Sequence, residues 1–141
     1  MAEIITSYKK SSQLKKVRKK KKRKKLIPLP RLLKKTQVAF NKYIRERDKD
    51  NGCISCGGKV TQAGHYVAQG SSSFLRFNTD NVNGQCAGCN TFKHGNLIKY
   101  RLRLVKKIGE ERVKYLENSM GTIKKWKRWE LEDLLKELNE T

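Results

Sequence analysis

Two segments of this sequence decide its fold: CISCGGKVTQAGHYV at positions 53–67 and NVNGQCAGCN at positions 81–90. Each contains one Cys-x-x-Cys pair, and together they supply all the cysteines of the chain, Cys53, Cys56, Cys86 and Cys89. Four thiolates satisfy the tetrahedral preference of zinc, and the spacing lets each pair wrap one ion from one side. The pattern predicts a structural zinc ion; two disulfides or four free thiols are the alternatives. Because four sulfur ligands leave no open coordination position, this zinc would stabilise the fold and would not catalyse.

The gap between the two pairs leaves room for a β-hairpin. KVTQAGHYV, from about Lys59 to Val67, and FLRFN, from Phe74 to Asn78, have the composition of short strands, and the small polar linker AQGSSS suits a hairpin loop. After the second pair, apolar residues recur at the spacing of a helix: Leu97, Tyr100, Leu104, Val105 and Ile108. Gly109 is expected to end this helix, and Glu110 and Glu111 suit the first turn of the next one.

Helices are expected on both sides of this core. From Arg31 to about Lys49, apolar residues form one stripe: Leu32, Leu33, Thr36, Phe40, Tyr43 and Ile44. A last helix is expected to begin near Thr122, a reasonable N-cap, and its buried face would contain Ile123, Trp126, Leu134, Leu135 and Leu138. The sequence thus predicts an α+β fold. A zinc-stapled ββα core at about 53–96 would be flanked by the N-terminal helix and by C-terminal helices at about 97–139.

The positive charge is strong and unevenly distributed. The formal net charge of the 141 residues is +21, and residues 1–35 hold 15 Lys and Arg against a single acid, Glu3. Like charges at this density cannot be buried, so residues 1–27 are expected to form a disordered basic arm before a domain at 28–141. Within the arm, five residues are candidates for contact with DNA or RNA phosphates: Lys19, Lys20, Lys21, Lys22 and Arg23. The alternative is a solubilising or localisation tail.

The sequence also bears on the cellular compartment of the protein. It has no apolar run near the roughly 18 to 20 residues that a membrane span needs. The basic start is not followed by the apolar segment of a secretory signal. These features favour the cytoplasm, where four cysteines more often bind a metal than form disulfides.

The candidate catalytic residues lie around the two cysteine pairs. Phosphodiester cleavage needs a base that deprotonates the attacking water and a cation that neutralises the developing charge. His65 can be the base because an unperturbed imidazole titrates near about pH 6.5, and Asn81 can hold its ring through a hydrogen bond. Asn90, His94 and Asn96 offer oxygen or nitrogen ligands for the cation. Positions 90 and 94 are one helical turn apart and can face the same ion.

The order of these residues resembles the HNH nuclease superfamily, whose signature is a histidine, a middle asparagine and a final histidine or asparagine. More specifically, the chain resembles the phage NinG family, to which the lambda recombination protein Rap belongs. The matching stretches run from about Phe40 to Glu117, over half of the chain: YIRERDKD, CISCG, AGHY, LRFNTDN, QCAGCN, KHGNLIKYR and KKIG.

This resemblance implies a DNA endonuclease with a ββα-metal fold that cuts branched recombination intermediates, such as Holliday junctions and D-loops, with magnesium or manganese. His65 would be the general base, Asn81 its positioning partner and Asn90 a residue at the catalytic metal. Arg76 and Lys93 would contact phosphate, although a structural salt bridge is an equal alternative for Arg76. A four-way junction is best cut by two symmetric active sites, which suggests a homodimer formed through one of the flanking helices.

Two positions depart from the HNH pattern. Many HNH proteins place a metal-binding aspartate just before the catalytic histidine, where this chain has Gly64, and Asn90 stands in place of the final histidine. His94 is either a ligand or an exposed, idle side chain. The alternative function is a non-catalytic zinc-knuckle module that binds DNA or RNA. The order of His65, Asn81 and Asn90 favours the nuclease, because a zinc knuckle alone needs none of them.

Overall fold

The computed structural model describes residues 22–141, which form an α+β fold. In chain order its elements are α1 (Leu29–Asp48), β1 (Gln62–His65), the 3-10 turn η1 (Ser73–Leu75), β2 (Val82–Gln85), the π-helical turn η2 (Gly88–Phe92), α2 (Leu97–Ile108), α3 (Glu110–Asn118) and α4 (Arg128–Glu140). Most of the predicted basic arm, including Lys19, Lys20 and Lys21, lies outside the described residues, whereas Lys22 and Arg23 are exposed. Within residues 22–141, no helix is both long enough and apolar enough to cross a bilayer.

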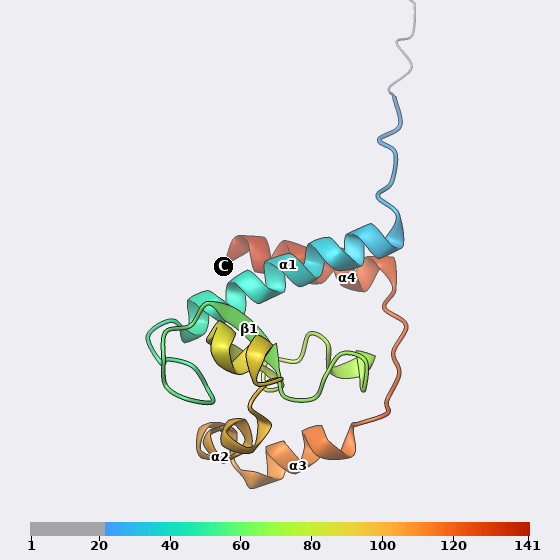
Figure 1. Cartoon of the computed structure of the whole chain (residues 1–141). Coiled ribbons are helices and arrows are strands. Elements are labelled where there is room, and N and C mark those ends of the chain that lie inside the picture. The colour runs from blue at the N-terminus through green and yellow to red at the C-terminus, as the bar shows by residue number, and fades with distance from the viewer. Residues whose placement is uncertain (1–21) are drawn as a thin grey trace, which may run out of the picture.

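A two-stranded antiparallel sheet lies between two pairs of helices (Figure 1). In this view α1 and α4 lie side by side above β1, and α2 and α3 lie below it. One apolar cluster, on the α1 side, is built on Phe40, Ile44 and Val82. A second cluster lies on the α2 and α3 side. The short strands are therefore fixed by packing from both sides.

The predicted N-terminal helix is confirmed by α1, which buries Leu32, Thr36, Phe40 and Ile44 along one face. Pro28 and Pro30 occupy the start of the helix, where a missing backbone N–H costs little. α4 runs beside α1 in the same direction (Figure 1). Near its start, Arg128 donates a hydrogen bond to the Ile27 carbonyl at 2.7 Å, and near its end Leu138 packs on the Phe40 cluster. The apolar faces of α1 and α4 cover each other, and α1 also covers the sheet.

Asp48, at the end of α1, joins three elements. Its side chain is only 3% exposed, and its carboxylate accepts a hydrogen bond from the Gly84 backbone N–H of β2 at 2.7 Å. Arg47 donates to the same carboxylate at 2.7 Å, and the Lys107 ammonium of α2 lies 3.2 Å away. Burial alone raises the pKa of Asp48, but the hydrogen bonds from Arg47 and Gly84 and the charge of Lys107 outweigh burial and lower it. The carboxylate is therefore ionised where it is buried.

The prediction of a second hairpin strand from Phe74 to Asn78 is wrong. β1 lies within the predicted strand at 59–67, but it pairs with β2, which places His65 opposite Val82. All four residues of β2 are buried even though most are polar or glycine, because their side-chain amides donate to buried oxygens; the Gln85 side-chain oxygen has no hydrogen-bond partner among the described residues. Asn83 donates to the Tyr100 hydroxyl at 3.1 Å, and the Gln85 amide donates to other buried oxygens.

The segment from Phe74 to Asn78 forms the turn η1 and its continuation instead of a strand. Leu75 is fully buried in the cluster on the α2 and α3 side, whereas Phe77 packs edge-on against Phe40 and Trp126 on the α1 side. The apolar side chains of this segment therefore serve two different clusters. This explains a strand-like composition in a segment that pairs with no strand.

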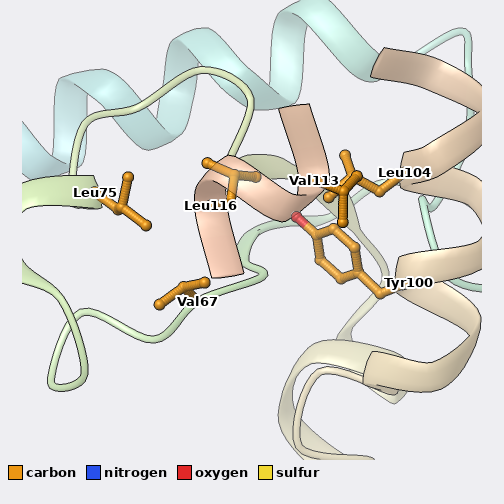
Figure 2. Packing of buried hydrophobic residues seen from close by; sticks show 6 residues of the cluster. All are labelled: Val67, Leu75, Tyr100, Leu104, Val113 and Leu116. Carbon is orange, nitrogen blue, oxygen red and sulfur yellow. The ribbon is translucent and has the colours of Figure 1, made fainter. Parts of the chain in front are cut away.

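The cluster on the α2 and α3 side is formed by these two helices and by the loop between the strands. Figure 2 shows six of its side chains packed together: Val67, Leu75, Tyr100, Leu104, Val113 and Leu116. Tyr100 is fully buried, and its hydroxyl donates to the Gly64 carbonyl of β1 at 2.8 Å. The predicted helices on either side of Gly109 are confirmed, and this residue ends α2 with a φ of 90°, a conformation that favours glycine.

The last helix begins at Arg128 and not near Thr122 as predicted. The segment before it is hydrogen-bonded to the start of η1, where the Trp126 indole donates to the Ser73 carbonyl at 3.0 Å. Ile123 is consequently 81% exposed and takes no part in a buried helix face. The inner side of α4 is formed by Leu131, which was not predicted and is fully buried, together with the partly buried Leu134, Leu135 and Leu138.

Candidate metal centre and active site

The two cysteine turns bring four sulfur atoms together. The Sγ atoms of Cys53, Cys56, Cys86 and Cys89 all lie within 4.8 Å of one another. Around a tetrahedral zinc with bonds of about 2.3 Å, the sulfur atoms are about 3.8 Å apart. The measured separation of 3.6 Å between Cys56 Sγ and Cys86 Sγ is close to this value. The four residues therefore fit a structural metal ion such as zinc.

Backbone N–H groups surround the sulfurs, as expected for thiolates that carry negative charge. The N–H of Gly58 lies 3.4 Å from Cys56 Sγ, and the N–H of Cys89 lies 3.4 Å from Cys86 Sγ. Burial raises the pKa of Cys53, but the surrounding backbone N–H groups outweigh burial and lower the pKa to about 7. Burial raises the pKa of Cys89 to about 11. A bound cation would favour the thiolate form at all four positions.

Asn96, a predicted ligand of the catalytic metal, faces the sulfur cluster instead. Its amide nitrogen lies 3.4 Å from Cys89 Sγ, so it acts as a donor to the sulfur. The adjacent Gly95 carbonyl accepts hydrogen bonds from Ser55 and Gln85, at 3.2 and 2.8 Å. This network ties the second cysteine turn to the first, and Asn96 therefore supports the structural centre.

Three of the predicted site residues line one open hollow of about 370 Å³: His65, Asn90 and His94. His65 comes from the end of β1, Asn90 from the π-helical turn η2, and His94 from the turn that follows it. The turn has ended before His94, whose φ of 48° is left-handed, so the predicted single helical turn across positions 90 and 94 is wrong. The two side chains nevertheless border the same space.

The imidazole of His65 is held in one orientation by a backbone carbonyl. Its Nε2 lies 2.9 Å from the Arg76 carbonyl oxygen. A carbonyl only accepts, so the 2.9 Å contact assigns the hydrogen to Nε2 and leaves Nδ1 as the acceptor nitrogen of the neutral ring; the Gln69 amide nitrogen, itself a donor, lies farther from Nε2, at 3.3 Å. Burial, aided by the charge of the Arg76 guanidinium, lowers the pKa of His65 below its ordinary value of 6.5, despite the hydrogen bond. The ring is therefore neutral at pH 7, as a general base must be.

Asn81 positions the loop and does not touch the ring. Its side chain is fully buried, accepts from the Val67 N–H at 2.8 Å and donates to the carbonyls of Val67 and Leu75 at 3.0 and 3.3 Å. These bonds close the loop that ends at Arg76. The predicted link between Asn81 and His65 is thus indirect: Asn81 holds the loop, and the Arg76 carbonyl holds the ring.

The guanidinium of Arg76 has no carboxylate partner among the described residues. It donates to the Gln69 side chain at 2.7 Å, and its Nε is buried without a hydrogen-bond partner. Burial lowers the pKa of Arg76. The alternative of a structural salt bridge is therefore not realised within residues 22–141. An unneutralised cation remains beside His65, where an anionic ligand would be favoured. Lys93, the other predicted phosphate contact of the folded part, is exposed.

The packing of Gly64 explains why no aspartate precedes the histidine. A Cβ at this position would lie 1.8 Å from the Gln85 side-chain oxygen and 2.9 Å from the Asn90 side-chain oxygen. Asn90 is itself fixed by donating to Gln62 at 2.7 Å. Neutral amides therefore stand where other sites use a carboxylate. The roles of Gln62, Gln69 and Gln85 were not predicted, and they depend on contacts between segments that no local sequence pattern reveals.

The hollow does not by itself form a magnesium site. Magnesium is usually held through carboxylate or phosphate oxygens, and the side chains that border the hollow provide only two imidazoles and amides. Anionic oxygens would have to come from a bound polyanion. Among the described residues, the four cysteines are the only cluster of His, Cys, Asp or Glu with the geometry of a metal site.

Comparison with known proteins places this chain in context. The family model described as "Bacteriophage Lambda NinG protein" matches residues 3–141. Over 111 residues, the chain is 40% identical to the protein "Protein ninG" of Escherichia phage lambda, which covers 77% of this chain and 52% of that protein. The proteins of the same name from Escherichia phage 933W and Salmonella phage P22 are also 40% identical, with 77% and 53% covered. The chain spans about half the length of these relatives. No solved structure matches it.

Proposed function

Because the chain belongs to the family of the bacteriophage lambda NinG protein, and because His65 borders the same hollow as Asn90 and His94, we propose that it is a DNA endonuclease with HNH-type chemistry. The observation that carries this proposal is the Nε2 contact of His65 with the Arg76 carbonyl. Within residues 22–141 it leaves a neutral imidazole with Nδ1 as an acceptor, beside a guanidinium that no carboxylate neutralises, and this combination suits phosphodiester hydrolysis.

In this proposal each residue has a separate task. Nδ1 of His65 accepts a proton from the attacking water, while the Arg76 carbonyl holds the opposite nitrogen. The Arg76 guanidinium offsets charge on the phosphate. Asn81 keeps the loop in place, and its role is therefore positional.

A divalent cation, magnesium or manganese, is part of the proposal. Asn90 and His94 are the side chains that would hold it, together with phosphate oxygens of the DNA. Such an ion would supply charge neutralisation at the scissile phosphate. Because the protein offers no carboxylate there, its affinity is expected to be low without DNA.

We further propose that the substrates are branched DNA intermediates of recombination, such as Holliday junctions and D-loops. This choice follows from the family and from the resemblance of its motifs. The net charge of +21 supports a nucleic acid as the partner. Two symmetric cuts would be made by a homodimer, although α1 and α4 already bury their apolar faces against each other.

The absence of a carboxylate in the hollow favours a second candidate, a non-catalytic zinc-stapled module that binds DNA or RNA. Both candidates predict salt-sensitive binding, so binding alone does not separate them. Only the nuclease would cut DNA, so a cleavage assay separates them.

The experiment compares the wild type with His65→Ala and His94→Ala on four-way-junction, D-loop and duplex DNA, each with magnesium, manganese or chelator. Metal-dependent cutting of branched DNA by the wild type, abolished in His65→Ala, is the expected result. His94→Ala is the matched histidine control: if His94 helps to hold the cation, higher metal concentration restores cutting in this variant but not in His65→Ala. Tight binding without cutting of any DNA would favour the binding module.

A further inference from the structure

Gln69 is a side chain of the hollow whose two ends meet different neighbours. It comes shortly after the end of β1, is half-buried, and lines the hollow together with His65. Its side-chain oxygen accepts a hydrogen bond from the Arg76 guanidinium at 2.7 Å, and its amide nitrogen lies 3.3 Å from Nε2 of His65. A guanidinium only donates, so this contact fixes the amide with its oxygen toward Arg76 and its nitrogen toward His65.

The amide nitrogen of Gln69 carries two hydrogens but has no acceptor among residues 22–141. The polar atom nearest to it is Nε2 of His65, which directs its own hydrogen to the Arg76 carbonyl at 2.9 Å. Two donors do not bond to each other, so the N–H groups of Gln69 are open to a ligand. Arg76 is not among the residues that line the hollow, whereas His65 is. The nitrogen end of the amide is therefore the end on the side of the hollow.

The charge of Arg76 makes this amide a stronger donor. Among the described residues the guanidinium has no carboxylate partner, and its Nε is buried without a hydrogen-bond partner. Its positive charge is therefore not neutralised. Hydrogen bonds in a chain polarise one another, so a charged donor at the oxygen end of Gln69 strengthens donation from the nitrogen end. The amide in this way presents part of the Arg76 charge to the hollow.

A donor of this kind favours an anionic oxygen as its acceptor. The residues that line the hollow include no Asp or Glu, so the acceptor has to come from solvent or from a ligand. A neutral amide is also the group that suits this position, because it accepts from a cation and donates to an anion at the same time. A carboxylate at position 69 would neutralise Arg76 and repel a phosphate.

We propose that Gln69 donates a hydrogen bond to a non-bridging oxygen of the scissile phosphate, and that Arg76 positions Gln69 for this contact. The inference rests on the proposed nuclease function for the identity of the ligand and adds a residue to its site. Negative charge builds up on these oxygens as the water attacks, so a donor that is fixed in advance stabilises the transition state more than the bound DNA. Gln69 consequently contributes more to the cleavage rate than to DNA affinity.

The test measures single-turnover cleavage of a four-way junction with magnesium or manganese, and the dissociation constant of the same DNA in chelator. Gln69→Met removes the amide and should lower the rate about 10²- to 10³-fold, the cost of one such donor. It should weaken binding roughly 2- to 12-fold, the range of a typical hydrogen bond. Gln69→Glu still accepts from Arg76 but no longer donates, and it should lose at least as much rate. Asn118→Asp, exposed at the end of α3, is the matched control for the added charge and should change neither quantity.

Gln69→Glu separates the proposed contact from a purely structural role. If Gln69 serves only to hold the Arg76 side chain, the glutamate keeps that bond and cuts at the wild-type rate, and the proposal is wrong. Unchanged cleavage by Gln69→Met would also overturn it. The role of Arg76 is tested by the double variant of Gln69→Met and Arg76→Met, whose loss should be far smaller than the product of the single losses. Independent losses would show that Arg76 does not act through Gln69.

Thermal unfolding followed by circular dichroism checks the fold of each variant. Gln69→Glu should melt no lower than the wild type, because a carboxylate accepts more strongly from a guanidinium than an amide does. A fall in Tm of both variants that parallels their loss of cleavage would reject the phosphate contact in favour of a structural role.

The two readouts also separate this inference from the nuclease function. If the wild type cuts no DNA but both Gln69 variants bind it more weakly in chelator, the phosphate contact is retained and the nuclease is rejected. If the wild type cuts and both variants cut equally well, the nuclease is retained and the contact is rejected.

Discussion

Replacement of Asn81 by alanine should destabilise the protein by about 3 kcal/mol. The fully buried Asn81 side chain makes three hydrogen bonds, to Val67 N–H at 2.8 Å and to the carbonyls of Val67 and Leu75 at 3.0 and 3.3 Å. A typical buried hydrogen bond contributes about 1 kcal/mol, and the Val67 N–H would be left unpaired in the interior. For a domain of this size, the loss corresponds to a fall in Tm of very roughly 12 °C.

Urea denaturation followed by circular dichroism measures the effect, with zinc present throughout. Asn118→Ala is the matched control, because Asn118 is exposed at the end of α3, and the change there should be within about 0.5 kcal/mol. The same variants should differ in function: Asn81→Ala lowers the cleavage rate more than DNA affinity, because the Arg76 carbonyl that holds His65 lies at the end of the same loop. A loss of stability below about 1 kcal/mol would refute the assignment of these hydrogen bonds.

Three further predictions concern the rest of the molecule. Cys53→Ser, or zinc removal by a chelator, should abolish the cooperative thermal transition seen by circular dichroism, because zinc binding in such small domains is folding energy; an unchanged Tm would refute the metal staple. Asp48→Ala should cost roughly 2 to 3 kcal/mol in urea denaturation at pH 7, since it leaves the Gly84 N–H unpaired while the cationic partners remain partly exposed. Folding lowers the pKa of Asp48, so its contribution to the free energy of unfolding is fully present above about pH 3.9 and disappears as the pH falls through the folded-state pKa. The stabilities of wild type and variant should therefore converge in acid. A difference that stays constant with pH would contradict this. Deletion of residues 1–27 should weaken duplex binding and flatten the dependence of log K on log salt by about 0.9 for each phosphate that the arm neutralises in the wild type, whereas an unchanged slope would make the arm irrelevant to binding.

The cysteine turns and the helices around Gly109 could be predicted because their signals are local. A Cys-x-x-Cys pair or an apolar stripe along a helix can be recognised within a single segment of the sequence. The second strand could not be predicted in this way. Val82–Gln85 reads as a polar turn, and it is a buried strand only because Asp48 and Tyr100, which are distant in sequence, satisfy Gly84 and Asn83.

The same distinction applies to the site. The residue types at positions 65, 81 and 90 led to the nuclease hypothesis, and the structure brings His65 and Asn90 to one hollow. The sequence did not reveal that Asn81 acts through a loop, or that Asn96 turns to a cysteine sulfur. A side-chain amide can both donate and accept hydrogen bonds and has many possible partners. Its role therefore follows from the fold and not from its spacing in the sequence.

The proposed function depends on His65 as the base of a metal-dependent nuclease. The most direct measurement is the single-turnover cleavage rate of a four-way junction by wild type and His65→Ala, at saturating protein and between pH 5 and 8. We expect the rate to be about 10²- to 10⁴-fold lower in the variant, with unchanged affinity. Because burial lowers the pKa of His65, the rate of the wild type should fall only below about pH 6.5, and this acid limb should be absent from the residual activity of the variant. A variant that cuts at the wild-type rate would contradict the assignment of His65 as the base.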